Sequence, residues 1–355
     1  MKIQSINKVK HQKKFEIKSS TISPHITKTS INELRNNQVS FNGLFEGVKI
    51  RLKAQENKKD ASLILEKSKE YQKQASEITQ KSQTLQEISK SVLRKSTRAY
   101  SDIKTAMELA KRSGAAAEIN PKNDECIRVY KQEGNNFVMR EYIEGILLRK
   151  AILTDNRLII TDLSPKSSNR YIFNTNTSEL LEYSVGIQTS AVGYKTDRKY
   201  SFKNYKLTSY DENYHTKPNA YESSQEHYVF KDGVLSMCYM DYHDDFDGFK
   251  KAQSVFEFKK DKLVSYTNGL REVKDAVGQK DEVFSFFEEN LCHYSQDLKQ
   301  LNDGTNEADK IYAFHNGKLI NAKFGFYLSP KGEEKSDEVF YYNPDTGKFR
   351  EYVKK

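Results

Sequence analysis

Aromatic and leucine residues recur with a regular spacing in the second half of the chain. Pairs of aromatics two positions apart repeat every 28 residues, and their second members are Phe202, Phe230, Phe258, Phe286, Phe314 and Tyr342. The first members are Tyr200, Tyr228, Phe256, Phe284, Tyr312 and Phe340. Five residues after the second aromatic, the first five units carry Leu207, Leu235, Leu263, Leu291 and Leu319. A fixed period of this length is typical of arrays in which one supersecondary unit packs on the next.

The residues between the aromatic and the leucine have turn chemistry. Asn316-Gly317 lies in the middle of the segment from Phe314 to Leu319, and Asn-Gly is the favoured pair of a two-residue type I′ hairpin turn. Such a turn predicts that Phe314 and Leu319 lie opposite each other on paired strands. Asp232-Gly233 has the same place in the second unit, and the last unit closes with a longer turn over residues 343–347. Each unit is therefore predicted to be a β-hairpin.

Side chains alternate between the two faces of a strand, so the paired aromatics and the leucine share one face. For the opposite face the spacing predicts three cross-strand pairs, Ile311 with Ala322, Val255 with Tyr266 and Val283 with Tyr294. Because both faces carry apolar residues, we expect another element to cover one of them, and the long helix described below is the candidate. Residues 283–303 also fit a helical spacing, so hairpin and helix both stay open there.

The fold class predicted from this pattern is mainly β, an antiparallel β-hairpin repeat array with a 28-residue period and a long N-terminal α-helix. The array covers residues 199–355, and residues 120–198 are predicted to form less regular hairpins with turns at Gly134-Asn135 and Asp155-Asn156. Residues 1–40, rich in Lys, Ser, Thr and Asn, are predicted to be a disordered basic tail. Residues 41–60 are expected to be a linker or a short docking strand.

A long amphipathic helix is predicted over residues 61–113, because the segment up to Arg112 lacks proline and glycine and Gly114 follows as a stop signal. Its heptad-like seam, typical of a coiled coil, consists of Tyr71, Ala75, Ile78, Ser82, Leu85, Ser89, Val92, Ser96, Ala99, Ile103, Ala106 and Ala110. Alternation of large residues with Ser and Ala permits close backbone approach but buries little apolar area. Packing on its own chain, packing on a helical partner and a hairpin of two shorter helices all stay open.

The segment from Tyr312 to Leu319, Tyr-Ala-Phe-His-Asn-Gly-Lys-Leu, resembles the MORN-variant hairpin repeats. In that family an aromatic strand, an Asn-Gly or Asp-Gly turn and a Lys-Leu strand recur. The resemblance implies an interaction or immunity-type role, and it carries over no functional residues.

Composition and charge narrow the possible partners. Of 355 residues 36% are hydrophobic, 30% charged and 12% aromatic, which suits aromatic-rich surfaces better than a thick core. Residues 1–118 hold 24 Lys and Arg against 12 Asp and Glu, so the net charge of +9 belongs to this third of the chain. This charge favours an anionic partner or keeps the segment solvated. The sequence shows no signal-peptide core and no stretch long enough to span a membrane, so we predict a cytoplasmic protein without a transmembrane segment.

Candidate chemistry is sparse. The acidic segment 241–248 makes Asp241, Asp245 and Asp247 the candidate metal ligands, but an EF-hand register would place His243 and Ser254 where it needs acidic residues. A polar loop between hairpins is the favoured interpretation of this segment. The cysteines and histidines that we considered do not have the spacing of a metal or nucleophile motif, and they are Cys126, Cys238, Cys292, His215, His227, His243, His293 and His315. We therefore predict no catalytic residues, no metal site and no cofactor.

Together these patterns predict a non-catalytic repeat protein that presents an extended aromatic β surface to a protein partner. The alternative is peripheral binding of nucleic acid or an anionic membrane through the basic N-terminal third. The sequence supplies no stacking platform for bases there, since it has no aromatic residue between Phe45 and Tyr71.

Overall fold

The structure is a computed structural model that describes residues 41–355, apart from the short segments 114–116, 120–125, 164–167, 191–192, 217–220, 245–247 and 274–275. Contacts divide the chain into two units, residues 1–49 and residues 50–355. Of the first unit only residues 41–49 are described, and they are helical. The tail predicted for residues 1–40 lies outside the described residues.

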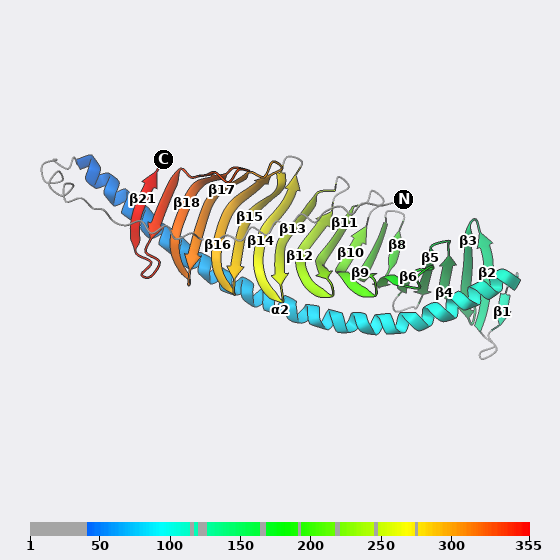
Figure 1. Cartoon of the computed structure of the whole chain (residues 1–355). Coiled ribbons are helices and arrows are strands. Elements are labelled where there is room, and N and C mark those ends of the chain that lie inside the picture. Colours follow the sequence, from blue (N-terminus) through cyan, green and yellow to red (C-terminus); the bar gives the residue numbers. More distant parts are fainter. Residues whose placement is uncertain are drawn as a thin grey trace, which may run out of the picture. The chain divides into compact units, whose positions relative to one another are not determined.

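The described strands join in one antiparallel sheet of 21 strands, which confirms the predicted mainly β fold class (Figure 1). Before the array lie β1 (Ala117–Ile119), β2 (Cys126–Glu133), β3 (Asn136–Ile143), β4 (Ile146–Leu153), β5 (Arg157–Leu163), β6 (Ser168–Asn174), β7 (Leu180–Val185) and β8 (Gln188–Ser190). The array consists of β9 (Gly193–Lys203), β10 (Lys206–Thr216), β11 (Glu222–Lys231), β12 (Val234–Asp244), β13 (Lys250–Lys259), β14 (Lys262–Val273), β15 (Ala276–Phe287), β16 (Asn290–Leu301), β17 (Asn306–His315), β18 (Lys318–Leu328), β19 (Glu334–Lys335), β20 (Glu338–Tyr342) and β21 (Phe349–Lys354).

Consecutive strands pair with each other, so the sheet grows hairpin by hairpin in chain order. The exceptions are β8, which pairs with β9 next to β7, and β19, which pairs with β18 next to β20. Residues 283–303 form the hairpin of β15 and β16, which decides between the two possibilities left open by the sequence. The upstream turns at Gly134-Asn135 and Asp155-Asn156 also lie where they were predicted.

One face of the array is an unbroken row of aromatic and apolar side chains, and we call it the inner face. Phe314 lies opposite Leu319 and Phe230 opposite Leu235, as the turn chemistry predicts. Across the sheet the rings of Phe256, Tyr266, Phe284 and Tyr294 follow one another with centroid separations of 4.9, 5.9 and 4.9 Å. These residues are buried. Each ring therefore contacts a ring of the next strand, and the contacts join neighbouring hairpins.

A β-bulge beside each of these leucines changes the register, and the three predicted back-face pairs are wrong. Phe314 lies opposite Leu319 but Ala313 lies opposite Asn321, so Ile320 is an extra residue in its strand. Ile311 consequently pairs with Lys323, Val255 with Thr267 and Val283 with Ser295. Ala322, Tyr266 and Tyr294 instead join the inner face, opposite Tyr312, Phe256 and Phe284.

The bulge residues have hydrogen bonds of their own at three of these positions. Thr208 Oγ1, Ser236 Oγ and Cys292 Sγ donate to the backbone oxygens of Ser201, Val229 and Ser285 at 3.1, 3.0 and 3.1 Å. A carbonyl next to a bulge loses its regular ladder partner, and a short hydroxyl or thiol side chain can replace that partner.

The helix α2 (Phe41–Ser113) is longer than predicted. Residues 41–60, expected to be a linker or a docking strand, belong to it. The seam predicted from Tyr71 onward continues backward with the same steps through Ile64, Ala61, Asn57 and Ala54, all of which are buried. Most of the predicted seam side chains lie outside the described residues, Val92 being half-buried.

Helix α2 packs on the inner face of its own sheet from residue 50 onward and crosses the strands along the whole array (Figure 1). Ala54 and Ile64 at one end and Tyr100 and Met107 at the other belong to one core with the inner-face aromatics. Ala54 and Ala61 are small residues of the helix that are buried in this core. Of the alternatives left open for the helix, packing on its own chain is confirmed.

Helix and sheet have matching repeats. Seven helical residues rise about 10.5 Å, and two strands advance about 9.6 Å, so one heptad spans one hairpin. Lys53 pairs with Glu338 and Lys67 with Glu282 at 3.4 Å, two heptads apart on the helix and two 28-residue units apart on the sheet. At the far end the ring of Tyr100 lies 4.8 Å from that of Phe173. The heptad spacing of the helix therefore follows from the width of a hairpin.

Candidate interaction surface

The face of the sheet opposite α2, which we call the outer face, is organised by a second set of 28-residue positions. Residues that alternate with the inner aromatics pair across neighbouring strands in one row, Lys199, Asp211, His227, Tyr239, Val255, Thr267, Val283, Ser295, Ile311, Lys323 and Val339. The row is apolar at every second strand from Val255 onward. At its beginning Lys199 and His227 replace the apolar residue.

A left-handed residue in each long strand brings further side chains onto the outer face. Asn213, Asp241, Gly269, Asp297 and Gly325 follow one another at the 28-residue period, and all have φ between 49° and 69°. The residue after each of them is aromatic or leucine. Tyr214 lies under the ammonium of Lys199, 3.9 Å from ring centroid to nitrogen, and Tyr242 stacks on His227 at 4.6 Å. The outer face therefore has its own partly buried apolar layer.

Where the row departs from valine and isoleucine, a polar cluster forms from Lys199, Asp211, Ser224, His227, Tyr239 and Tyr242. Asp211 is buried, with 4% of its surface exposed. One carboxylate oxygen accepts a hydrogen bond from Ser224 Oγ at 2.8 Å and lies 2.7 Å from His227 Nδ1. Two donors thus compensate the cost of burying this carboxylate.

The polar cluster lacks the connectivity of a hydrolytic site. In a nucleophile arrangement histidine bridges the hydroxyl and the carboxylate, but here the hydroxyl of Ser224 donates directly to Asp211. Burial, together with the charge of Glu257, raises the pKa of Tyr239 to about 12, so its hydroxyl stays protonated at neutral pH. The arrangement can offer hydrogen bonds and ring faces to a partner, and it does not activate Ser224.

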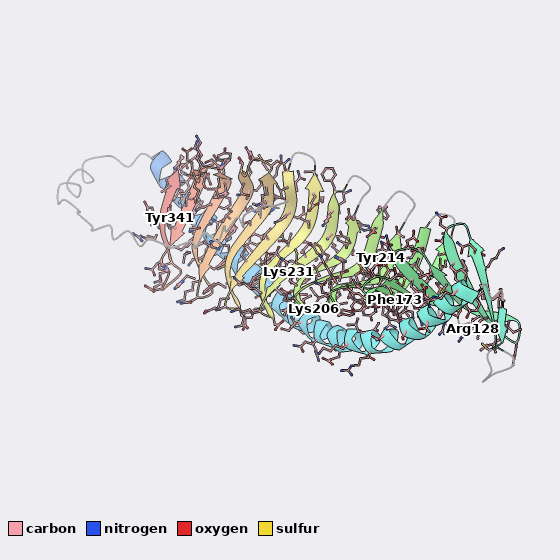
Figure 2. The ribbon with its side chains drawn as sticks, turned by 45° about the vertical axis from the view of Figure 1, so that its right-hand side comes forward. Arg128, Phe173, Lys206, Tyr214, Lys231 and Tyr341 are labelled. Atoms are coloured by element: carbon pink, nitrogen blue, oxygen red, sulfur yellow. The ribbon has the colours of Figure 1, made fainter. Side chains whose placement is uncertain are left out.

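The outer face also carries large apolar side chains that remain exposed. Phe287 is 69% exposed, Val234 45% and Tyr341 39%, and each is the neighbour of a buried inner-face residue in its strand. Figure 2 labels Tyr341 on β20, near the C-terminal end of the array. They lie on β12, β15 and β20 and are therefore spread along the array.

At the turn end of the hairpins, several lysines form ion pairs or hydrogen bonds with the neighbouring hairpin. Lys206 pairs with Asp232 at 3.6 Å and Lys262 with Glu289 at 3.4 Å, in each case across to the next hairpin. Lys318 donates to the backbone oxygen of Asp345 in the same manner. Lys206 and Tyr214 lie toward opposite ends of β10, so this edge is distinct from the position of Tyr214 (Figure 2). The exposed Val234 and Phe287 flank turns and therefore belong to the turn end as well.

Of the three candidate metal ligands that the sequence suggests, only Asp241 lies in the described part of the chain. Asp241 is exposed in β12 with a φ of 49°, and Asp245 and Asp247 lie outside the described residues. No group of three or more His, Cys, Asp or Glu side chains able to hold a metal occurs among the residues described. None of the three cysteines forms a disulfide; Cys126 and Cys238 are buried and Cys292 is partly buried.

In the structure His227 and Ser224 both contact the carboxylate of Asp211, an arrangement that the sequence analysis did not recognise. His243 lies in a separate contact, its Nδ1 2.7 Å from the hydroxyl of Tyr221. The sequence contains a signal for His227. The equivalent position in successive 28-residue units is lysine, then histidine at 227, and then only valine or isoleucine. The contact with Ser224 had no such signal, since it depends on the twist of the strands.

Several clefts lie between α2 and the sheet, and two of them lie beside the inner-face aromatics. One of about 500 Å³ is lined by Lys73 and Gln80 of the helix and by Phe258, Lys262 and Glu289 of the hairpins. Its lysines and carboxylates balance each other.

The other cleft, of about 300 Å³, is lined by Tyr171, Tyr183, Tyr200 and Arg198. Burial raises the pKa of Tyr171, Tyr183 and Tyr200, so these hydroxyls also stay protonated.

No helix in the described part of the chain is long and apolar enough to cross a membrane.

Comparison of the chain with protein-family models finds no match, and comparison with the curated proteins finds none either.

Proposed function

We propose that this chain is a non-catalytic repeat protein that binds another protein through the outer face of its hairpin array. The observation that carries the proposal is the asymmetry of the sheet. Its inner face is closed by α2, whereas the outer face presents the polar cluster on β9–β12 and the exposed side chains of Val234, Phe287 and Tyr341 along the array. An extended, regular sheet suits a protein partner better than a small ligand, because its contacts repeat over many hairpins.

The chemistry of the outer face supports the same role. Exposed aromatics give large contact area at little entropic cost, and the surrounding short polar side chains can form the rim of an interface. The resemblance to MORN-variant hairpin repeats implies an interaction role as well, and it forms part of this proposal. Because Ser224 is held by a carboxylate, the polar cluster serves recognition and not turnover.

The test compares two charged variants of the full chain. Phe287→Glu with Tyr341→Glu places two charges on the outer face, and Leu52→Glu with Leu63→Glu places two on exposed positions of α2, which are 55% and 57% exposed. Each immobilised protein is used to capture partners from an extract of the source cells, followed by quantitative mass spectrometry. We expect a partner retained by the wild type and the helix variant to be lost from the outer-face variant.

Three outcomes would contradict the proposal. A partner lost only from the helix variant would place the interface on α2, and a set of partners unaffected by either variant would exclude both faces. A partner lost at high salt and on deletion of residues 1–40 would instead favour binding through the basic N-terminal third. The deletion must stop at residue 40, because residues from Ile50 onward belong to the unit that contains the sheet.

A further inference from the structure

A third cleft between α2 and the last hairpin differs in charge from the two described above. It has a volume of about 280 Å³ and is lined by Arg51, Ala54, Gln55, Lys58, Lys348 and Phe349. Residues 51, 55 and 58 follow steps of four and three and therefore share one side of the helix. Phe349 begins β21, and Lys348 precedes it at the end of the turn.

The three basic side chains of this cleft have no acidic counterpart. None of the lining residues is acidic, and among the residues described no carboxylate forms an ion pair with Arg51, Lys58 or Lys348. Some exposed cations of the array are paired, such as Lys206 with Asp232 and Lys262 with Glu289. The cleft therefore concentrates positive charge that the fold itself does not use.

The floor of the cleft is apolar. Ala54 is buried, Phe349 is half-buried, and Lys58 Nζ lies 6.0 Å from the ring centre of Tyr342 next to it. Lysine and arginine bury their aliphatic stems along such a surface and keep their charged ends in water. An apolar floor under cationic rims is complementary to a molecule with a short apolar body and an anionic head.

We propose that this cleft binds a small amphiphilic anion, with its carboxylate or phosphate head between Arg51, Lys58 and Lys348 and its apolar body on Ala54 and Phe349. The volume is close to the lower limit of about 300 Å³ for small-molecule sites, so the body is short. This site is distinct from the outer face and does not rest on the function proposed for it.

Isothermal titration of the full chain with octanoate tests the proposal. Acetate has the charge without the apolar body, and 1-octanol has the body without the charge. We expect octanoate to bind at least about tenfold more tightly than either, because each lacks one of the two interactions. If octanol binds as tightly as octanoate, the basic side chains do not contribute to binding. If acetate binds as tightly as octanoate, the apolar floor does not contribute.

Octanoate binding by substituted variants then tests whether the ligand occupies this cleft. Arg51→Gln, Lys58→Gln and Lys348→Gln together should weaken octanoate binding about tenfold, since three exposed charge contacts are lost. Lys203→Gln, Lys231→Gln and Lys259→Gln together remove the same charge from the turn end and should change it less than about twofold. Gln55→Glu, which adds a negative charge between the cations at an exposed position, should also weaken it. All seven positions are exposed, so unchanged circular dichroism is expected for each variant.

Titration with octyl phosphate in place of octanoate compares the two head groups. The ligand that binds more tightly shows whether the site prefers a phosphate or a carboxylate. The proposal is overturned if the two triple variants behave alike, or if neither free amphiphile binds while vesicles containing an anionic lipid do.

Discussion

Single residues with left-handed backbone angles decide where each hairpin turns and where its strands change direction. Lys260 and Asp261 have φ of 52° and 61° and form a two-residue turn, as do Asn316 and Gly317. A type I′ turn requires this conformation at both positions, and only glycine adopts it without a steric cost. The array therefore keeps its turn geometry even where the sequence lacks Asn-Gly, at a cost of about 1 kcal/mol per residue.

A stabilising double substitution follows from that cost. Lys260→Asn with Asp261→Gly replaces two side chains in the turn between β13 and β14 by the pair that the turn prefers. We expect the free energy of unfolding to rise by about 1 kcal/mol, measured by urea denaturation. Lys259→Gly, one residue earlier in a regular strand, is the control and should lower it. A turn variant no more stable than the wild type would contradict this view of the turns.

The left-handed position within the strands gives a second prediction at this scale. Gly269 has a φ of 69°, and a Cβ built on it would overlap the carboxylate of Asp281. Gly317 has a φ of 72° and open space around its Cα. Gly269→Ala is therefore expected to cost about 2–4 kcal/mol and Gly317→Ala only about 1 kcal/mol, in urea denaturation of each variant. Equal costs would show that Asp281 moves away freely.

At the scale of elements, the helix and the hairpins are held in register by contacts that recur with their two periods. Lys53 with Glu338 and Lys67 with Glu282 belong to this series, and the ammonium of Lys53 also lies 5.0 Å from the ring centre of Phe324. A slip by one heptad would keep the steric match but change which charges meet. Ion pairs at these positions therefore select one register among several of similar packing.

Glu338 makes this register sensitive to acid. The hydrogen bond from Lys53 holds the pKa of Glu338 below its ordinary value of 4.5. Its contribution to stability is therefore complete above about pH 4.5 and is lost as the pH falls through the lowered pKa. We expect Glu338→Gln to destabilise the chain at pH 7 and to match the wild type more closely near pH 3, measured by urea denaturation across this range. Glu351→Gln, at an exposed position of β21, should leave the pH profile unchanged.

At the scale of the whole molecule, the main contacts of each hairpin among the residues described join it to its neighbours and to the stretch of helix that crosses it. Stability in such an array is a sum of local terms, and it need not be lost everywhere at once. The hydroxyl of Tyr342 donates to the backbone oxygen of Ala54, which ties the last hairpin to the first part of the packed helix. Loss of that part of α2 is therefore expected to destabilise the sheet only locally.

Truncation tests this view. Deleting residues 1–60 removes Ala54 and Asn57 from the inner face, so amides of β20 and β21 should exchange at least about tenfold faster with deuterium. Amides of β3 and β4, at the other end of the sheet, should be unaffected. Deletion of residues 1–40 is the control and should change neither region. Faster exchange over the whole sheet would show that the molecule unfolds as one cooperative unit.

Much of the array could be predicted because its determinants are local. The period, the hairpins and the pairing of Phe314 with Leu319 all follow from turn chemistry and strand alternation over a few residues. The back-face pairs failed because the sequence does not reveal the bulge at Ile320. The first part of α2 was missed because Gly43 and Gly47 weaken its helical pattern, although the seam already extends to Ala54.

Ring spacing and turn residues act within a single unit, so the amino-acid sequence alone establishes an array of hairpins with one aromatic face. Which element covers that face, and which charges meet across it, follows from three-dimensional packing, because these contacts join residues hundreds of positions apart, such as Lys53 and Glu338. The polar cluster around Asp211 was likewise decided by twist and bulges. Strand twist and bulges set the distances between side chains on neighbouring strands, and these distances cannot be read from the spacing of residues along the chain.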